Sequence, residues 1–155
     1  MREMLCKGKR VDNGEWVEGY FVGAGVCMII PQDAEHWGGV DFNEGYIVDP
    51  ETAGQYTGLI DKHDKRIFEG DIVRYWDGKN CFTAQVVFEC GAFGIARRPE
   101  LPISFPHACN NDNFMSLWEL IWNQEYLEPN CVDLLRVIGN VHDNPELLTN
   151  EKAGE

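Results

Sequence analysis

Apolar and polar residues alternate along the first third of the chain, a pattern that predicts β-strands. The stretch KRVDNGEWVEGYFV places Asn13-Gly14 between two β-favouring runs, which is typical of a tight hairpin. A third strand is predicted at 26–30, ended by Pro31, and a polar, glycine-rich loop follows it. A short strand is predicted at 46–48, and the acidic stretch 49–52 predicts a turn or the first turn of a very short helix.

A second hairpin is predicted in the middle of the chain. The run CFTAQVVFEC (81–90) alternates with a period of two, so one face of this strand is expected to be buried. Gly91 permits a turn, and AFGIARR then returns as the partner strand. Residues 99–113 contain three prolines and are predicted to form a long loop.

One helix is predicted at 114–127, where apolar residues recur at helical spacing behind a cap at Asn113. A final strand is predicted at 133–141. The sequence Asn144-Pro145 then predicts a capped terminal turn, with the proline at the first helical position. The last residues, 149–155, are expected to be a frayed tail.

These elements predict a mainly β fold of antiparallel hairpins, with an α+β fold as the alternative. Residues 1–56 are expected to form an N-terminal β-hairpin region. Residues 57–148 are expected to form a second region that carries a helical insertion at 99–130. An alternative is that both regions pack as one compact unit.

The charge of the chain narrows the choice of partner. The 155 residues carry a net charge of −13, and the acidic excess lies in the flanks: ten acidic against four basic residues in 1–60, and nine against two in 101–155. Nucleic-acid affinity needs a basic surface that displaces counterions, so direct nucleic-acid binding is disfavoured. A partner protein or a second copy of the chain is the expected contact.

The distribution of apolar residues predicts the cellular compartment of the protein. No apolar run approaches the roughly 20 residues that span a bilayer, and MREMLCKGKR lacks the apolar core of a signal peptide. We therefore expect no membrane insertion and a cytoplasmic location. The six cysteines are expected to be reduced: Cys6, Cys27, Cys81, Cys90, Cys109 and Cys131.

Three stretches together resemble the YopX-like family of phage and prophage proteins: GKRVDNGEWVEGY (8–20), YIVDPETAGQYTGLIDKHDKRIFEGDIVRY (46–75) and VIGNVHDNPELL (137–148). The resemblance implies a mostly β protein in a bacterial host cell, with an SH3-like barrel in its later part and no known activity. The chain departs from the family at His63-Asp64, where relatives commonly carry Asn-Gly. Because aspartate tolerates positive φ less well than glycine, a strained or different turn is expected there.

Five residues that can carry protons or bind metals lie within 61–71, but their spacing argues against a shared site. A calcium loop needs a central glycine and a glutamate at its twelfth position, and this segment has neither. Gly70 is instead expected to allow a bend, with Asp71 accepting backbone hydrogen bonds at the start of a strand. The five residues are Asp61, His63, Asp64, Glu69 and Asp71.

Two further pairs of residues are candidates for a metal or nucleophile site. His107 and Cys109 lie two residues apart, and His142 precedes Asp143, but zinc sites usually combine four ligands in paired spacings. No glycine-rich phosphate loop precedes a helix. The sequence therefore predicts no catalytic, cofactor-binding or metal-binding residue, and no cofactor.

The leading functional hypothesis is a non-enzymatic, phage-derived accessory protein that works by protein contact. Trp118 and Trp122 lie on the predicted helix beside the proline-rich loop, where they form either core or an exposed patch that binds a partner. One alternative is an acidic nucleic-acid mimic that occupies a host DNA-binding protein. Another is a small hydrolase built on Asp61, His63 and Asp71, or on a cysteine.

Overall fold

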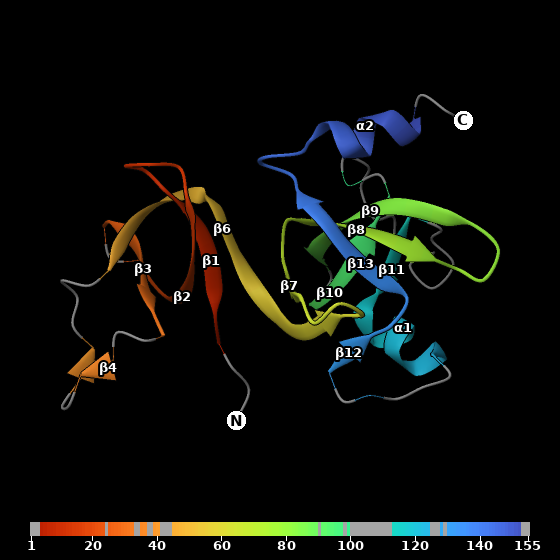
Figure 1. Ribbon diagram of the computed structural model, residues 1–155, viewed down its shortest axis with the longest axis horizontal. Coiled ribbons are helices and arrows are strands. Elements are labelled where there is room, and N and C mark those ends of the chain that lie inside the picture. The colour runs from red at the N-terminus through yellow and green to blue at the C-terminus, as the bar shows by residue number, and fades with distance from the viewer. Residues whose placement is uncertain are drawn as a thin grey trace. The chain divides into compact units, whose positions relative to one another are not determined.

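The computed structural model describes residues 4–23, 25–32, 35–36, 39–40, 45–89, 91–97, 99, 113–124, 128 and 130–152. The chain divides into two compact units, 1–56 and 57–155. Strand β6 (Tyr46–Asp61) contributes its first part to unit 1 and its last residues to unit 2 (Figure 1). Strands dominate both units and almost all pair antiparallel, so the predicted mainly β fold is confirmed.

Unit 1 is a small ring of antiparallel strands. Strands β1 (Cys6–Arg10), β2 (Trp16–Gly23), β3 (Cys27–Pro31) and β6 pair in that order, and β1 also pairs with β6. Ile29 and Val48 are fully buried, and a Cβ on Gly8 would lie 3.1 Å from each of them. The two short strands β4 (Glu35–His36) and β5 (Gly39–Val40) pair within the segment predicted as a loop.

Two turns in unit 1 differ in detail from the expectation. The Asn13-Gly14 hairpin is present, but only Gly14 of these two residues has a positive φ (72°). The connection is also longer than a two-residue turn, because the bond that closes it runs from Arg10 N to Glu15 O, at 2.8 Å. The prediction of a turn or short helix at 49–52 was wrong, because these residues belong to β6 and form an irregularity in its pairing with β1. The Thr52 hydroxyl donates to Asp49 O at 2.7 Å and accepts from Lys9 N at 2.8 Å, where the register between β1 and β6 shifts.

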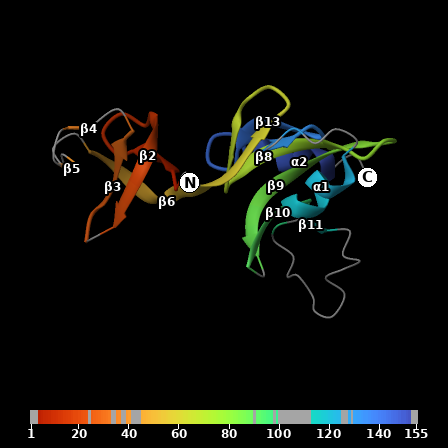
Figure 2. The same cartoon turned by 90° about the horizontal axis from the view of Figure 1, so that it is seen from below.

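Unit 2 is organised by a five-stranded antiparallel sheet in the order β11-β10-β9-β8-β13 (Figure 2). The second hairpin, β9 to β10, is confirmed, and Gly91 turns it with a φ of 79°. The short strands β7 and β12 pair with the end of β6, β12 in parallel. The strand bounds are β7 (Arg66–Phe68), β8 (Asp71–Trp76), β9 (Cys81–Glu89), β10 (Ala92–Ala96), β11 (Phe114–Ser116), β12 (Cys131–Val132) and β13 (Leu135–Asn140).

Two helices pack on this sheet at different strands. Helix α1 (Leu117–Asn123) contacts β10, β11 and β12, whereas α2 (Glu146–Lys152) contacts β9 (Figure 1). Leu117 and Leu120 bring α1 into the main hydrophobic cluster, which removes their apolar surface from water. The other members of the cluster are Ile67, Val73, Tyr75, Ala84, Val86, Ile95, Val132 and Leu135.

The prediction of a single helix at 114–127 was wrong in two respects. Residues 114–116 form β11 against β10, and the Phe114 ring lies against Gly94: a Cβ at this glycine would overlap the ring and lie 2.7 Å from Met115 O. Ser116 rather than Asn113 caps the helix. Residues 125–127 and most of the predicted 99–113 loop lie outside the described residues.

The second error concerns the end of the chain. Helix α2 continues to Lys152, so the predicted frayed tail starts too early at 149. Asn144-Pro145 begins the helix as expected, with Leu147 N donating to Asn144 O at 3.1 Å. Contact with β9 gives the helix a tertiary support that a capped turn alone would lack.

Candidate interaction surface

Helix α1 begins at a complete capping box. The Ser116 hydroxyl accepts from Glu119 N at 3.2 Å, and a Glu119 carboxylate oxygen accepts from Ser116 N at 3.2 Å. Two backbone N–H groups that helix geometry leaves without partners are thereby satisfied. Because Ser116 also ends β11, the first turn of the helix is fixed to the edge of the sheet.

The other end of α1 is held by one side-chain amide. Gln124 donates from Nε2 to Cys131 O at 2.9 Å and accepts at Oε1 from Asp133 N at 3.0 Å. This pair of bonds ties the end of α1 to β12 and to the turn before β13. A seven-residue helix has little stability of its own, so the two attachments and the buried leucines hold it.

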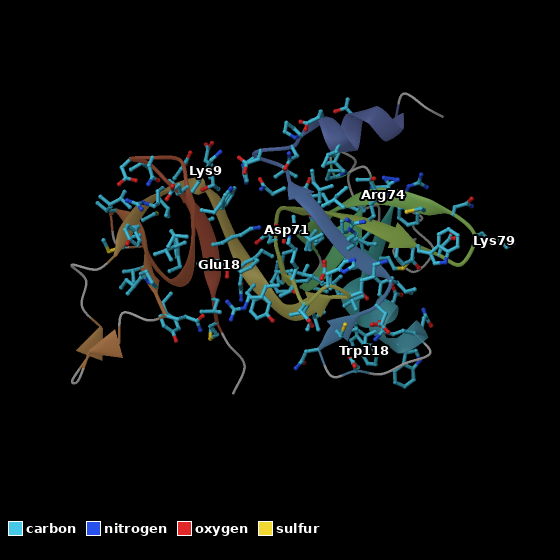
Figure 3. All side chains as sticks on the ribbon, viewed as in Figure 1. Lys9, Glu18, Asp71, Arg74, Lys79 and Trp118 are labelled. Carbon is cyan, nitrogen blue, oxygen red and sulfur yellow. The ribbon has the colours of Figure 1, made fainter. Side chains whose placement is uncertain are left out.

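The outer side of this fixed helix carries two tryptophans, which we call the tryptophan pair: Trp118 and Trp122. Their side chains are 63% and 73% exposed, against 49% for Trp76. The rings meet edge to face, with centroids 5.1 Å apart and an interplanar angle of 65°. Figure 3 shows Trp118 on the outer side of α1. Both tryptophans are thus exposed and not part of the core, whereas partner binding through them stays a prediction. Exposed aromatic surface on a fixed element is typical of contact sites.

Acidic residues act on the buried Cys131, whose carbonyl accepts from Gln124 at the end of α1. The buried Cys131 thiol donates to a carboxylate oxygen of Asp133 at 3.4 Å and lies within the field of Glu128 and Asp64. Burial first, and then these carboxylates, raise the pKa of Cys131 to about 11. We call Asp64, Glu128 and Asp133 the acidic rim.

The pKa of Cys131 predicts a loss of stability in alkali. Its folded value of about 11 exceeds the ordinary 9.0, so the unfolded chain releases this proton first as the pH rises. The contribution is complete below pH 9 and falls by on the order of 2 kcal/mol by pH 11. Urea unfolding at pH 8 and at pH 11 measures it, and Cys131→Ser should reduce the wild-type slope in this range while keeping the part that comes from Tyr75, whose pKa burial also raises. An equal slope in both proteins would contradict the assignment.

Asp61 is a structural carboxylate at the end of β6. It is completely buried; one oxygen accepts from His63 N and Lys65 N at 2.8 and 2.9 Å, and the other from Val137 N at 2.8 Å. Hydrogen bonds to an ionised group are stronger than neutral ones. The side chain therefore joins the turn after β6 to β13, which lies 76 positions further along the chain.

The triplet Glu69-Gly70-Asp71 is the corner that the sequence predicted. Gly70 has a φ of 90°, donates to Val86 O and accepts from Val141 N, both at 2.9 Å. Asp71 is 1% exposed and accepts from Phe68 N at 2.8 Å (Figure 3). Both buried aspartates of the segment thus bind backbone, whereas His63 and Asp64 are exposed, so the five candidate residues do not form one site.

Asp64 has the positive φ that the departure from the family pattern predicted, at 62°. This conformation strains a residue with a side chain and suits glycine. We expect Asp64→Gly to raise the free energy of unfolding by about 0.5–1 kcal/mol, measured by urea unfolding. Asp64→Ala is the matched control, since it removes the same carboxylate and keeps the strain. Equal stability of the two variants would contradict strain at this turn.

The remaining candidates do not add a second site among the described residues. Asn140 accepts from His142 N and Asp143 N at 3.0 Å, which makes His142-Asp143 part of a turn. Cys6, Cys27, Cys81 and Cys131 are not joined in disulfides, and His107, Cys90 and Cys109 lie outside the described residues. In the part of the chain that the structure describes, no three His, Cys, Asp or Glu residues gather as metal ligands, and no helix is long and apolar enough to cross a membrane.

The candidate interaction surface includes residues that could not be predicted from the sequence. Gln124, Glu128 and Asp133 come together only because the turn before β12 brings the chain back to α1. Ser116 is different, since the Ser-x-x-Glu pattern of Ser116 and Glu119 was visible in the sequence and indicates a helix start.

Fold and site together define a mainly β protein with an aromatic surface on a fixed helix. Residues 30–149, well over half of the chain, match the YopX protein family, and the chain belongs to it. The match includes two of the stretches on which the resemblance was drawn, 46–75 and 137–148, while 8–20 lies before it. No curated protein is significantly similar to the chain.

Proposed function

We propose that this protein is a non-enzymatic accessory protein of phage or prophage origin that acts by binding a protein partner through the tryptophan pair. The observation that carries the proposal is the exposure of Trp118 and Trp122 on a helix fixed at both ends. Tryptophan is enriched among the residues that dominate binding energy at interfaces, and a rigid mount lowers the entropic cost of binding.

Unit 2 supplies the scaffold in this proposal. Its five-stranded antiparallel sheet supports an SH3-like barrel as the more specific fold. The proposed site of action is the cytoplasm of the bacterial host, which is compatible with four cysteines that form no disulfide. The two buried aspartates that a hydrolase would use, Asp61 and Asp71, bind backbone N–H groups instead, and this favours a binding role.

The test is affinity capture from host cells with three full-length baits. Trp118→Ser/Trp122→Ser should lose a host or phage protein that the wild type retains, while Trp76→Ser, the matched control on β8, should keep it. Surface substitutions of this kind usually change stability by less than about 0.5 kcal/mol, so folding is preserved. Equal capture by wild type and double variant would overturn the proposal.

A second candidate, the acidic nucleic-acid mimic, is favoured by one observation, the acidic rim. A mimic binds through exposed carboxylates, so its capture of a basic host protein should fall steeply with salt and should not depend on the tryptophans. The same three baits therefore separate the two functions.

A further inference from the structure

The tryptophan pair and the acidic rim are parts of one surface. Gln124 lies two residues after Trp122 and binds both Cys131 O and Asp133 N, so the rim begins where α1 ends. Asp133 contacts the Cys131 thiol directly, and Glu128 and Asp64 act on the same thiol through their charge. Glu128 and Asp64 are exposed, as are both tryptophans.

The stretch that carries the tryptophan pair, Glu128 and Asp133 is acidic in sequence: residues 113–135 hold four acidic residues and no Lys or Arg, whereas Asp64 lies between Lys62 and Lys65 on the turn after β6. Helix α1 carries Glu119 and no basic residue in its last turn. Residues 101–155 hold nine acidic and two basic residues in all. An acidic ligand would be repelled here, and a second copy of a chain with a net charge of −13 would meet the same repulsion. Charge complementarity therefore selects a basic occupant.

The aromatic part of the surface favours the same occupant for an independent reason. The face of an indole attracts cations more strongly than any other aromatic side chain, and arginine uses this contact more often than lysine. A guanidinium also stacks flat on a ring and binds a carboxylate through two N–H groups at once. Tryptophan faces on the outer side of α1, with the carboxylates of the acidic rim attached to its end through Gln124, match both properties.

We infer that the tryptophan pair and the acidic rim dock a basic, arginine-bearing segment of a partner protein. The inference rests on the proposed function and specifies the chemistry of its partner. Arginine side chains lie over Trp118 and Trp122, and neighbouring basic groups face Glu128 and Asp133. The apolar parts of the segment cover the remaining ring surface.

The experiment is calorimetric titration of the full chain with three synthetic peptides of one sequence rich in Arg, Leu and Ala. One peptide is unmodified, one carries neutral citrulline at every arginine, and one carries glutamate there. The arginine peptide should bind, and the other two should bind at least about tenfold more weakly. Raising the salt to about 0.5 M should weaken the arginine peptide several-fold.

Variants locate the contact. Trp118→Ser/Trp122→Ser should weaken the arginine peptide by at least about tenfold, and Glu128→Lys by about three- to fivefold. Trp76→Ser should leave its affinity unchanged. Equal binding of the citrulline peptide, or full affinity in the double variant, would overturn the inference.

Two outcomes separate this inference from the proposed function. Tryptophan-dependent capture of a partner from cells, combined with no binding of the arginine peptide, would overturn the basic partner and retain the protein contact. Tryptophan-dependent dimerisation of the chain in sedimentation analysis would identify a second copy as the occupant and would also overturn the inference.

Discussion

Replacing Asp61 with alanine is expected to lower the free energy of unfolding by about 4 kcal/mol. The carboxylate is completely buried and accepts three backbone N–H groups, those of His63, Lys65 and Val137. Alanine offers no acceptor, and the turn after β6 would lose its bond to β13. The loss should appear in urea unfolding as a lower midpoint with little change in slope.

Asp61→Asn is the matched control for shape. Its amide oxygen can serve the two donors that share one carboxylate oxygen, but its NH2 group would then face Val137 N–H. We expect an intermediate loss of about 2 kcal/mol. If the alanine variant were as stable as the asparagine variant, the three bonds would not be what holds this corner.

Replacing Gly19 with alanine is the second substitution for which we expect a large loss of stability, and the loss should affect unit 1. A Cβ at Gly19 would meet the Ile30 carbonyl, and it would lie 2.7 Å from Ile30 C and 3.0 Å from the Pro31 Cα. All three are backbone atoms of β3, which cannot rotate away as a side chain can. We expect a loss of about 3 kcal/mol and weaker hydrogen-exchange protection in β2 and β3.

Gly23→Ala provides the control on the same strand. Its Cβ would lie 3.1 Å from the Phe21 ring, a 40%-exposed side chain that can move. This variant should therefore retain near wild-type protection. Similar protection in the two variants would show that close packing of β2 on β3 does not require glycine at position 19.

The strands that sequence reasoning found are those with local signals. The Asn13-Gly14 turn and the alternation before Gly91 each depend on residues within a few positions, and both hairpins are present. The corner at Gly70-Asp71 was predictable for the same reason.

The errors arose where distant contacts outweighed local preference. Residues 114–116 fit the helical spacing of the residues that follow, but they pair with β10, where the Phe114 ring packs against Gly94. Likewise, the charged residues within 61–71 suggest an active or metal-binding site in the sequence. In the structure, the backbone N–H of Val137, far along the chain, donates to one carboxylate oxygen of Asp61. Such pairings have no local signature.

The candidate site also combines features that the sequence indicates locally with features that depend on distant contacts. The two tryptophans and their i, i+4 spacing were visible in the sequence, although their exposure was not, because either core or surface suits that spacing. The acidic rim depends on how 128–133 returns to α1, which the sequence does not indicate.

Photo-crosslinking in the host cell tests most directly whether the tryptophan pair is a protein contact. A benzophenone amino acid is placed at Trp122 in one full-length protein and at Trp76 in another, both exposed positions of unit 2. We expect a discrete crosslinked protein from position 122 and none from position 76. No crosslink from 122, or the same crosslinked protein from both positions, would contradict it.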